Sequence, residues 1–313
     1  MPHQKNVNPA GNHTVLPRIL SKRNHLQLPP IEPLGNPEPE NSSAPVAIAP
    51  AWHTIVLVVA IIVLSIHNAG RLSAIHGSID RLASYGFSAA MEVVMLAWVV
   101  LGLRLKRIPL RSLLGSFSFD ARSIASDLGV ALIFWFCSLM VLGTLGIAWS
   151  SVEAALVHRQ TPAHVAGQSG QTGNAGQTGK AEKALARDPE QIERLRALSQ
   201  LAPANGREIA AWTLLCLLVG FIEEIVFRGY LQRQFIGWAR GGVVTGVLAS
   251  AVVFGSAHAY QGVRGMVLLT VFGALFSMLA LHRGSLRAGI FAHAWHDLIA
   301  GLALALLKSN HVI

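Results

Sequence analysis

The sequence predicts an all-α protein, built as a polytopic transmembrane helix bundle of about seven spans. Hydrophobic residues make up 52% of its 313 positions and charged residues only 13%, whereas a soluble domain carries roughly 25% charged residues. The mean hydropathy is +0.47. The apolar residues also gather in long runs close to the roughly 20 residues that a helix needs to span a bilayer. Together these observations favour a membrane protein over a soluble one.

Seven apolar segments define the expected spans. They lie at about 51–67, 83–103, 128–149, 208–236, 243–260, 265–282 and 286–307. The fourth segment is long and carries polar residues in its middle, which indicates a helix with a function beyond anchoring.

Four regions follow from these segments. Residues 1–50 are polar and Pro-rich without apolar periodicity, so we expect a disordered N-terminal tail. Three transmembrane helices are expected over residues 51–149, a long flexible loop over 150–207, and the remaining four spans over 208–307. The predicted seven-helix bundle is therefore divided by one large loop.

The large loop contains both a linker and a short helix. Its centre, Gly167 to Lys180, reads GQSGQTGNAGQTGK, a low-complexity stretch typical of a flexible linker. After it, Pro189 follows an Asp, as at the start of a helix. Ile192, Leu195 and Leu198 then recur at helical spacing. This pattern predicts a short helix, either lying in the membrane interface or serving as a solvated spacer.

Charge distribution indicates the orientation and excludes some functions. The net charge is +9, but no basic patch with interleaved aromatic residues argues for nucleic acid. Cys137 and Cys216 lie within apolar runs and form no CxxC motif. On the opposite side of the membrane we count only Arg71, Arg81, Arg264 and Lys308, whereas the short loops after segments two, four and six hold more basic residues: Arg104, Lys106, Arg107, Arg111, Arg122, Arg233, Arg240, Arg283 and Arg287. The positive-inside rule places these loops, and hence the N-terminus, in the cytoplasm and the C-terminus outside.

The membrane itself is expected to be a prokaryotic cytoplasmic membrane. The first 50 residues lack the apolar core of a signal peptide, so the run that begins near Ala51 serves as the first anchor. The protein is therefore expected to be a multi-pass protein whose partners are the lipid bilayer and a membrane-associated peptide or protein substrate.

Ionisable residues gather in the C-terminal spans. Segment four reads FIEEIVFRGY from Phe221, segment five reads FGSAH from Phe254, and segment seven reads FAHAWHD from Phe291. Each ionisable side chain inside a span costs roughly 2.5–3.5 kcal/mol on insertion scales. Because several such side chains carry this cost, we expect them to pair with one another, to serve a function, or both.

Helical geometry divides these residues into roles. Glu224 and Arg228 are four residues apart and are expected to pair on one helix face. Glu223 points about 100° away from Glu224, so it lacks that partner and is left for chemistry. His293 and Asp297 are again four apart. His258 lies on another helix, late in its segment, whereas His293 lies early in its own, so straight helices would place the two imidazoles at different depths.

Three motifs in this order resemble the CPBP family of intramembrane peptidases, which includes the type II CAAX prenyl endopeptidases and bacteriocin-processing proteins. The residues that carry the resemblance are Glu223-Glu224…Arg228, Phe254…His258 and His293…Asp297, with FRGYLQ and RGSLRAGIFAHAWHD around them. The resemblance covers roughly residues 208–307. It implies an intramembrane endopeptidase acting on a membrane-associated or CAAX-like substrate.

The resemblance also implies residue roles. Glu223 would activate the attacking water with assistance from His258, while His293 and Asp297 would hold the scissile carbonyl and stabilise the oxyanion. Glu224 and Arg228 would brace the helix. Asp297 stands where well-studied eukaryotic members have Asn, and an ionised Asp cannot donate a hydrogen bond to an oxyanion.

Metal dependence is left open by the residues. Glu223, His258 and His293 are able in principle to ligate one Zn²⁺ with an open coordination position. The chain has no HExxH motif, and a metal-free mechanism based on the glutamate is the other possibility for the family.

Two other functions remain as alternatives. The first is a catalytically silent immunity or scaffold protein of the same family, which three intact motifs disfavour. The second is a proton-coupled transporter, which the absence of an obvious inverted repeat disfavours. Outside the motifs, Glu92 has no assigned partner beyond an interhelical hydrogen bond or a cavity wall. His53 is expected at the headgroup level near a span end.

Overall fold

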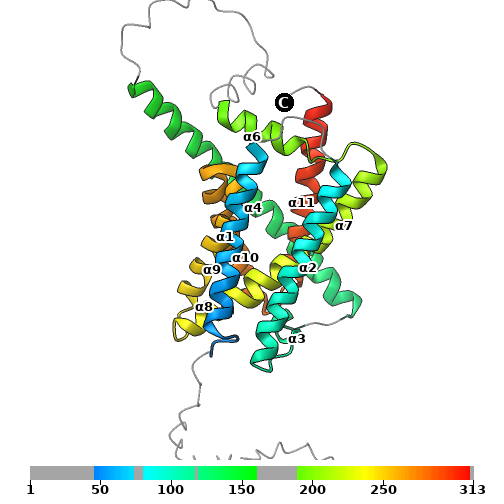
Figure 1. The fold of residues 1–313 in the computed structure, drawn as a ribbon, viewed down its shortest axis with the longest axis vertical. Helices are drawn as coiled ribbons and strands as arrows, with labels where there is room; N and C mark the ends of the chain where they lie inside the picture. The colour runs from blue at the N-terminus through cyan, green and yellow to red at the C-terminus, as the bar shows by residue number, and fades with distance from the viewer. Residues whose placement is uncertain (1–45, 74–79, 117–118, 161–188, 311–313) are drawn as a thin grey trace, which may run out of the picture. The chain divides into compact units, whose positions relative to one another are not determined.

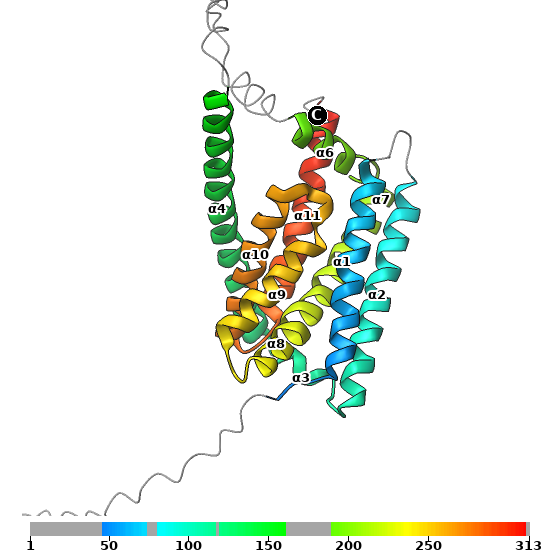
Figure 2. The same cartoon turned by 60° about the vertical axis from the view of Figure 1, so that its left-hand side comes forward.

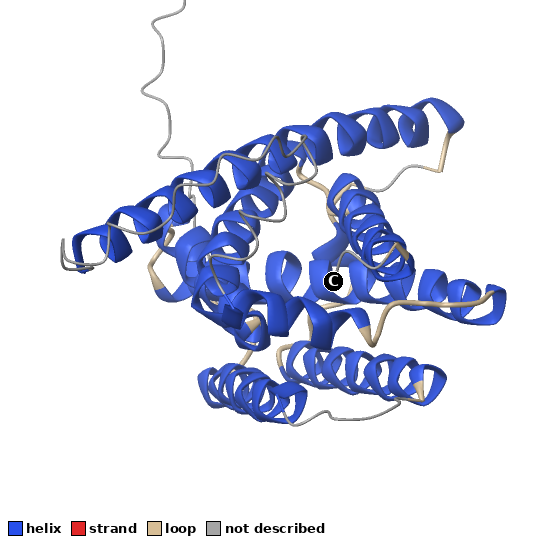
Figure 3. Cartoon of the chain, turned by 90° about the horizontal axis from the view of Figure 1, so that it is seen from above, coloured by secondary structure: helices blue, strands red, loops and turns tan. Residues whose placement is uncertain are grey.

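The computed structural model describes residues 46–73, 80–116, 119–160 and 189–310, and these residues form helices without any strand (Figure 3). The helix bounds are α1 Ala51–Ser73, α2 Arg81–Leu105, α3 Arg111–Leu114, α4 Ala121–Gln160, α6 Pro189–Ser199, α7 Gly206–Glu223, η2 Glu224–Leu231, α8 Gln232–Trp238, α9 Val243–Ala257, η3 Ala259–Gln261, α10 Gly262–Arg283 and α11 Arg287–Ser309. Segment η2 is a π-helix and η3 is a single 3₁₀ turn.

Six helical stretches are long and apolar enough to cross a membrane. They are residues 51–69, 81–105, 121–153, 206–238, 259–283 and 287–309. Helix α9 is the seventh apolar helix and is shorter, at 15 residues. Large apolar side chains such as Ile133, Ile147 and Val244 stay exposed on the outside, as expected where the solvent is lipid. The all-α, polytopic membrane architecture predicted from the sequence is confirmed.

The predicted boundaries differ from the structure in two places. Helix α4 continues to Gln160, through residues that the sequence assigned to the large loop. Helix α9 ends at Ala257, before the expected end at residue 260, because the His258 amide bonds to the Gly255 carbonyl and the chain turns into η3. The short helix predicted after residue 188 is present as α6. Residues 1–45 of the predicted N-terminal tail and the Gly/Gln-rich linker lie outside the described residues, whereas the end of that tail is ordered by hydrogen bonds from Ile48 and Ala49 to Gln234.

The centre of the bundle is the continuous helical stretch α7–η2–α8. All eight residues of η2 are buried, and a helix that is buried on every side belongs at the core of a bundle. The π-helical hydrogen bond from the Gln232 amide to the Phe227 carbonyl closes this segment. Helices α2, α9 and α11 all contact this central stretch. Side chains of η2 therefore face several neighbouring helices instead of lipid.

Helix α1 is fastened to the central stretch by buried polar contacts. The Tyr230 hydroxyl lies 3.0 Å from His53 Nδ1 and 2.9 Å from Thr54 Oγ1. Gln234 accepts hydrogen bonds from the amides that precede α1 and donates to the Ala49 carbonyl. His53 lies near the start of α1, as expected, and its side chain is buried with its ring stacked on Trp98.

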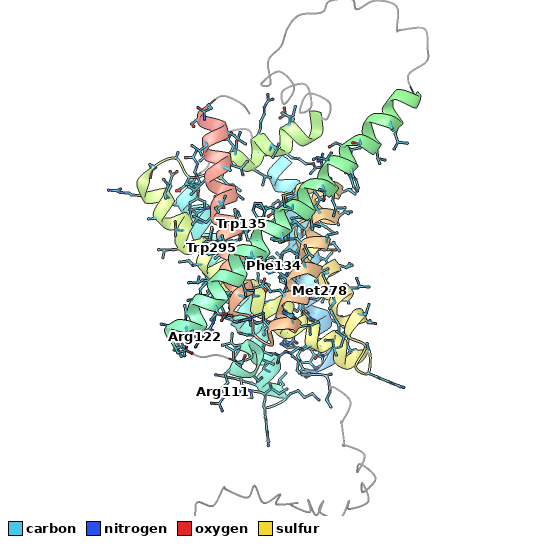
Figure 4. The ribbon with its side chains drawn as sticks, turned by 180° about the vertical axis from the view of Figure 1, so that it is seen from behind. Arg111, Arg122, Phe134, Trp135, Met278 and Trp295 are labelled. Carbon is cyan, nitrogen blue, oxygen red and sulfur yellow. The ribbon has the colours of Figure 1, made fainter. Side chains whose placement is uncertain are left out.

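Helix α4 is fastened at its N-terminal end to the turn between α10 and α11. Asp127 is buried and forms salt bridges with Arg283 and Arg287, and Arg287 also donates to Ser123. Further along α4, Phe134 packs edge-on against Phe276 of α10 with ring centroids 4.8 Å apart. Figure 4 shows α4 crossing this face of the bundle, with Phe134 labelled. These contacts fix the start of α11, the helix that carries His293.

The positions of the first and last helices allow the orientation of the protein in the membrane to be tested. Helix α1 begins at the end of the bundle that also holds α3, and α11 finishes at the opposite end (Figure 1). With the basic loops in the cytoplasm, we expect a fluorescent protein fused to the N-terminus to fluoresce. Alkaline phosphatase fused after residue 313 should be active, because that enzyme folds only outside the cytoplasm. The reverse pattern in both fusions would contradict the orientation.

Substituting Asp127 tests whether its salt bridges with Arg283 and Arg287 stabilise the packing of α4 against the start of α11. Asp127→Ala removes the carboxylate that neutralises the buried Arg287 guanidinium, and breaking a buried pair from one side costs about 3–5 kcal/mol. We expect a clearly lower Tm in detergent. Glu193→Ala is the matched control, because it removes the exposed pair with Arg196, which contributes at most about 1 kcal/mol. Equal Tm values for the two variants would show that the Asp127 network does not stabilise the fold.

Candidate active site

A buried ion pair forms the base of the site. Arg228 Nη1 lies 2.9 Å from Glu224 Oε1, and both side chains are almost completely inaccessible to solvent. The guanidinium carbon also lies over the rings of Phe254, at 4.4 Å, and Phe276, at 5.0 Å. Gly289 of α11 leaves room for the carboxylate, because a Cβ there would lie 2.8 Å from Glu224 Oε2. The pair expected from the four-residue spacing is present.

His293 lies between the two neighbouring glutamates. Its Nδ1 is 3.0 Å from Glu224 Oε1, within hydrogen-bond distance. Its Nε2 faces Glu223 Oε2 at 3.6 Å and Asp297 Oδ2 at 3.7 Å, which are ion-pair distances. Glu224 therefore does more than brace the helix, the role that the sequence assigned to it. It also fixes the orientation of the His293 ring.

Glu223 keeps an unused acceptor. Its Oε2 atom is buried and has no hydrogen-bond partner among the described residues, since 3.6 Å to His293 is too long for a hydrogen bond. Its side chain is 12% exposed, whereas Glu224 is fully buried. The carboxylate expected to be free of an arginine partner is thus oriented toward the imidazole, with one buried oxygen that accepts no hydrogen bond from the described residues.

His258 reaches the same neighbourhood from the end of α9. Its Nδ1 lies 2.9 Å from the Phe254 carbonyl oxygen. The centroid of the Phe254 ring lies 4.8 Å from that of His258 and 6.0 Å from that of His293. Asp297 is close enough to His258 to interact with it electrostatically. Both imidazoles contact the Phe254 ring, and α9 runs obliquely through the bundle (Figure 2).

The break after α9 is held by a serine of α1. Ser65 Oγ donates to the Ala257 carbonyl at 2.7 Å and accepts from the Ala259 amide at 3.0 Å. These two bonds satisfy backbone groups that the end of a helix leaves open, which is essential where water is scarce. The bonds fix the backbone on both sides of His258.

Two residues near the site were not assigned to it from the sequence, although Glu92 stood out as a carboxylate expected to form an interhelical hydrogen bond or to line a cavity. Glu92 of α2 interacts electrostatically with Glu223, His293 and Asp297, and its Oε2 is buried without a hydrogen-bond partner among the described residues. Tyr260 of η3 interacts electrostatically with Glu223, Asp297 and Glu92. A carboxylate inside a span marks Glu92 as unusual, but its spacing along α2 does not reveal which helix it faces.

The residues expected to bind a metal do not form a ligand set in the structure. Within the described ranges, no group of three or more His, Cys, Asp or Glu side chains has the arrangement to hold a metal ion. Instead, His293 directs Nδ1 at Glu224, and the His258 Nδ1 is engaged by a backbone carbonyl. The zinc set of Glu223, His258 and His293 therefore stays a prediction.

Comparison with known proteins identifies the region that holds the site. Residues 205–299 match a family model described as type II CAAX prenyl endopeptidase Rce1-like. No curated protein and no solved structure matches the chain. The matched region begins just before α7 and ends within α11, so it contains all three motifs. This region is therefore similar to the Rce1-like family, in agreement with the resemblance of its motifs to the CPBP family.

Proposed function

We propose that the protein is an intramembrane endopeptidase, which hydrolyses a peptide bond of a membrane-associated, CAAX-like substrate by means of a water molecule that Glu223 activates. The observation that carries the proposal is the position of His293 between Glu224, Glu223 and Asp297. A purely structural ion pair would be complete with Glu224 and Arg228. The added imidazole and second carboxylate supply groups that accept and stabilise a proton.

The proposed reaction begins at the unpartnered oxygen of Glu223. A water molecule hydrogen-bonded there gives its proton to the carboxylate, and its oxygen attacks the scissile carbonyl carbon. The C–O bond forms while the carbonyl oxygen gains negative charge. When the C–N bond breaks, the proton held by Glu223 passes to the leaving nitrogen. The products are a carboxylic acid and an amine, and no redox partner is needed.

The histidines position and stabilise this reaction in different ways. Glu224 holds Nδ1 of His293, so Nε2 stays directed at Glu223 and Asp297. A proton on His293 would be stabilised by the surrounding carboxylates. Asp297 acts as an acceptor for His293, in place of donating to the substrate. His258, whose ring contacts that of Phe254, adds a second imidazole to the proposed site.

Substituting Glu223 tests the proposed base directly. We expect Glu223→Gln to abolish cleavage of a prenylated CAAX-type reporter and of a bacterial membrane-peptide library by the purified protein in detergent, because an amide cannot accept the proton of water. His293→Ala should also abolish cleavage. Glu208→Gln is the matched control, since Glu208 lies on the same helix and pairs with Arg81 at 3.3 Å. Each assay is run with and without a chelator, so that metal dependence is measured separately.

The outcomes separate the candidate functions. Cleavage that persists in Glu223→Gln and His293→Ala would show that the site is wrong. A wild-type protein that cleaves neither the reporter nor any library member would contradict the peptidase proposal and favour a silent immunity or scaffold protein.

The ion pair offers a second test that distinguishes folding from chemistry. Glu224→Leu leaves the Arg228 guanidinium buried without its carboxylate, so we expect a loss of about 3–5 kcal/mol in stability. Adding Arg228→Met should restore much of the Tm, because an apolar pair of similar volume replaces the charges. Cleavage should stay absent in the double variant, because His293 still lacks the acceptor for Nδ1. Recovery of cleavage together with Tm would contradict the orienting role of Glu224.

A further inference from the structure

His258 lies at a break in the helical backbone. Helix α9 ends at Ala257, and His258 has φ −106° and ψ 25°, which are not α-helical angles. The turn η3 follows before α10 begins. The end of a helix leaves carbonyl groups without an intrahelical donor, and inside a membrane such groups must be satisfied by the protein. The position of this histidine therefore depends on the contacts that satisfy the interrupted backbone.

The imidazole of His258 is itself bonded to the end of α9. In a continued α-helix the Phe254 carbonyl would accept the backbone amide of His258. Here that amide bonds to the Gly255 carbonyl at 3.0 Å, and the ring Nδ1 lies 2.9 Å from the Phe254 oxygen instead. A carbonyl oxygen can only accept, so the ring donates from Nδ1. The direction of the ring is therefore set by the backbone of the break.

Ser65 of α1 bonds to the backbone on both sides of His258. Its hydroxyl donates to the Ala257 carbonyl at 2.7 Å and accepts from the Ala259 amide at 3.0 Å. One hydroxyl is both a donor and an acceptor, so a single buried side chain satisfies two peptide groups of opposite kind. Ser65 thus ties the break to a separate helix.

The buried face of α1 brings Ser65 to this position. His53, Leu57, Ile61 and Ser65 follow one another at intervals of four residues, and all four are buried, so they lie along one face of the helix. At the start of this face, His53 Nδ1 lies 3.0 Å from the Tyr230 hydroxyl of η2. Helix α1 is therefore fixed to the central stretch at one end of this face and to the break after α9 at the other.

The ring of Phe254 connects the break to the rest of the site. Its centroid lies 4.8 Å from that of His258 and 6.0 Å from that of His293. The guanidinium carbon of Arg228 lies 4.4 Å from the same ring. Because these groups pack around one side chain, a displacement of the break would move the His258 imidazole relative to His293.

We propose that Ser65 is a positioning residue of the peptidase, which holds the His258 imidazole in place through its two hydrogen bonds to the backbone around the break. The assignment rests on the proposed peptidase function, in which His258 assists the activation of water by Glu223. In this role Ser65 neither binds the substrate nor transfers a proton. Helix α1, which lies outside the matched region 205–299, thereby contributes to catalysis.

The test compares Ser65→Ala with Ser250→Ala in the full-length protein. Ser250 is the matched control, because its buried hydroxyl also donates to a backbone carbonyl of another helix at 2.7 Å, that of Phe227, and not to the break. A displacement of about 1 Å costs up to about 100-fold in rate. We therefore expect Ser65→Ala to lower kcat by about 10–100-fold with KM changed less than about threefold. Ser250→Ala should keep the wild-type kcat at a similar loss of Tm.

Adding His258→Ala to each variant shows whether the effect passes through the imidazole. Two residues that act through the same group have non-additive effects. Once His258 is replaced, Ser65→Ala should cause little further loss of kcat. A loss as large in the His258→Ala background as in the wild type would overturn the positioning role.

The protonation of the ring gives a readout that needs no cleavage. Nitrogen NMR of Glu223→Gln protein labelled at histidine distinguishes a protonated Nδ1 from an unprotonated one. We expect a single His258 form with the proton on Nδ1 when Ser65 is present and in Ser250→Ala. In Ser65→Ala we expect a mixture of tautomers, because the ring is no longer held against the Phe254 carbonyl. An unchanged His258 signal in Ser65→Ala would overturn the assignment.

The remaining outcomes separate the two proposals. Cleavage lost in Glu223→Gln but equal in Ser65→Ala and Ser250→Ala would overturn the role of Ser65 while the peptidase function stands. Cleavage that is absent from the wild type, or that is equal in wild type and Glu223→Gln, would overturn the peptidase proposal and with it the catalytic role of Ser65. The NMR comparison would still measure whether Ser65 fixes the ring of His258.

Discussion

The structure depends on one buried carboxylate, Glu224, which is shared between Arg228 and His293. A carboxylate and a guanidinium in a low-dielectric interior are expensive to desolvate unless each is well paired. The surrounding helices are arranged to provide that pairing. Phe254 and Phe276 cover the guanidinium with their rings, and Gly289 lets α11 approach closely enough for His293 to reach the carboxylate. The same contact that neutralises the charge therefore orients the imidazole.

The other polar contacts inside the bundle keep these helices in register. Tyr230 fastens the central stretch to α1 through His53 and Thr54, and Asp127 fastens α4 to the start of α11. Lipid offers little hydrophobic force to hold helices together, so polar bonds and close packing do this work. Because Ser65 also holds the break between α9 and η3, helices outside the Rce1-like region fix the position of residues inside it.

The sequence predicts interactions along a helix well and contacts between helices poorly. The four-residue spacing was enough to pair Glu224 with Arg228 and to leave Glu223 without an arginine, because helical geometry is fixed. It did not reveal that Glu92 of α2 interacts electrostatically with Glu223, that His53 is buried against Trp98, or that α9 stops at Ala257. These depend on which faces of separate helices meet. The periodicity within one helix does not specify which of its faces contacts a neighbouring helix. The π-helical turns of η2 also change the direction in which its side chains point.

The imbalance between acceptors and donors gives the site its chemical character. Four carboxylates interact with the imidazole of His293: Glu92 of α2, Glu223 at the end of α7, Glu224 of η2 and Asp297 of α11. The Nδ1 atom of this imidazole is within hydrogen-bond distance of Glu224. Such a set is suited to take a proton from water and to hold it, but it opposes negative charge on a substrate. A hydrolase built on it therefore needs a hydrogen-bond donor among these acceptors. Nε2 of His293 lies 3.6 Å from Glu223 and 3.7 Å from Asp297, distances too long for hydrogen bonds, so a proton on this nitrogen is not committed to either carboxylate. The imidazole that Glu224 orients is thus also the group of this cluster that is able to offset negative charge on a substrate.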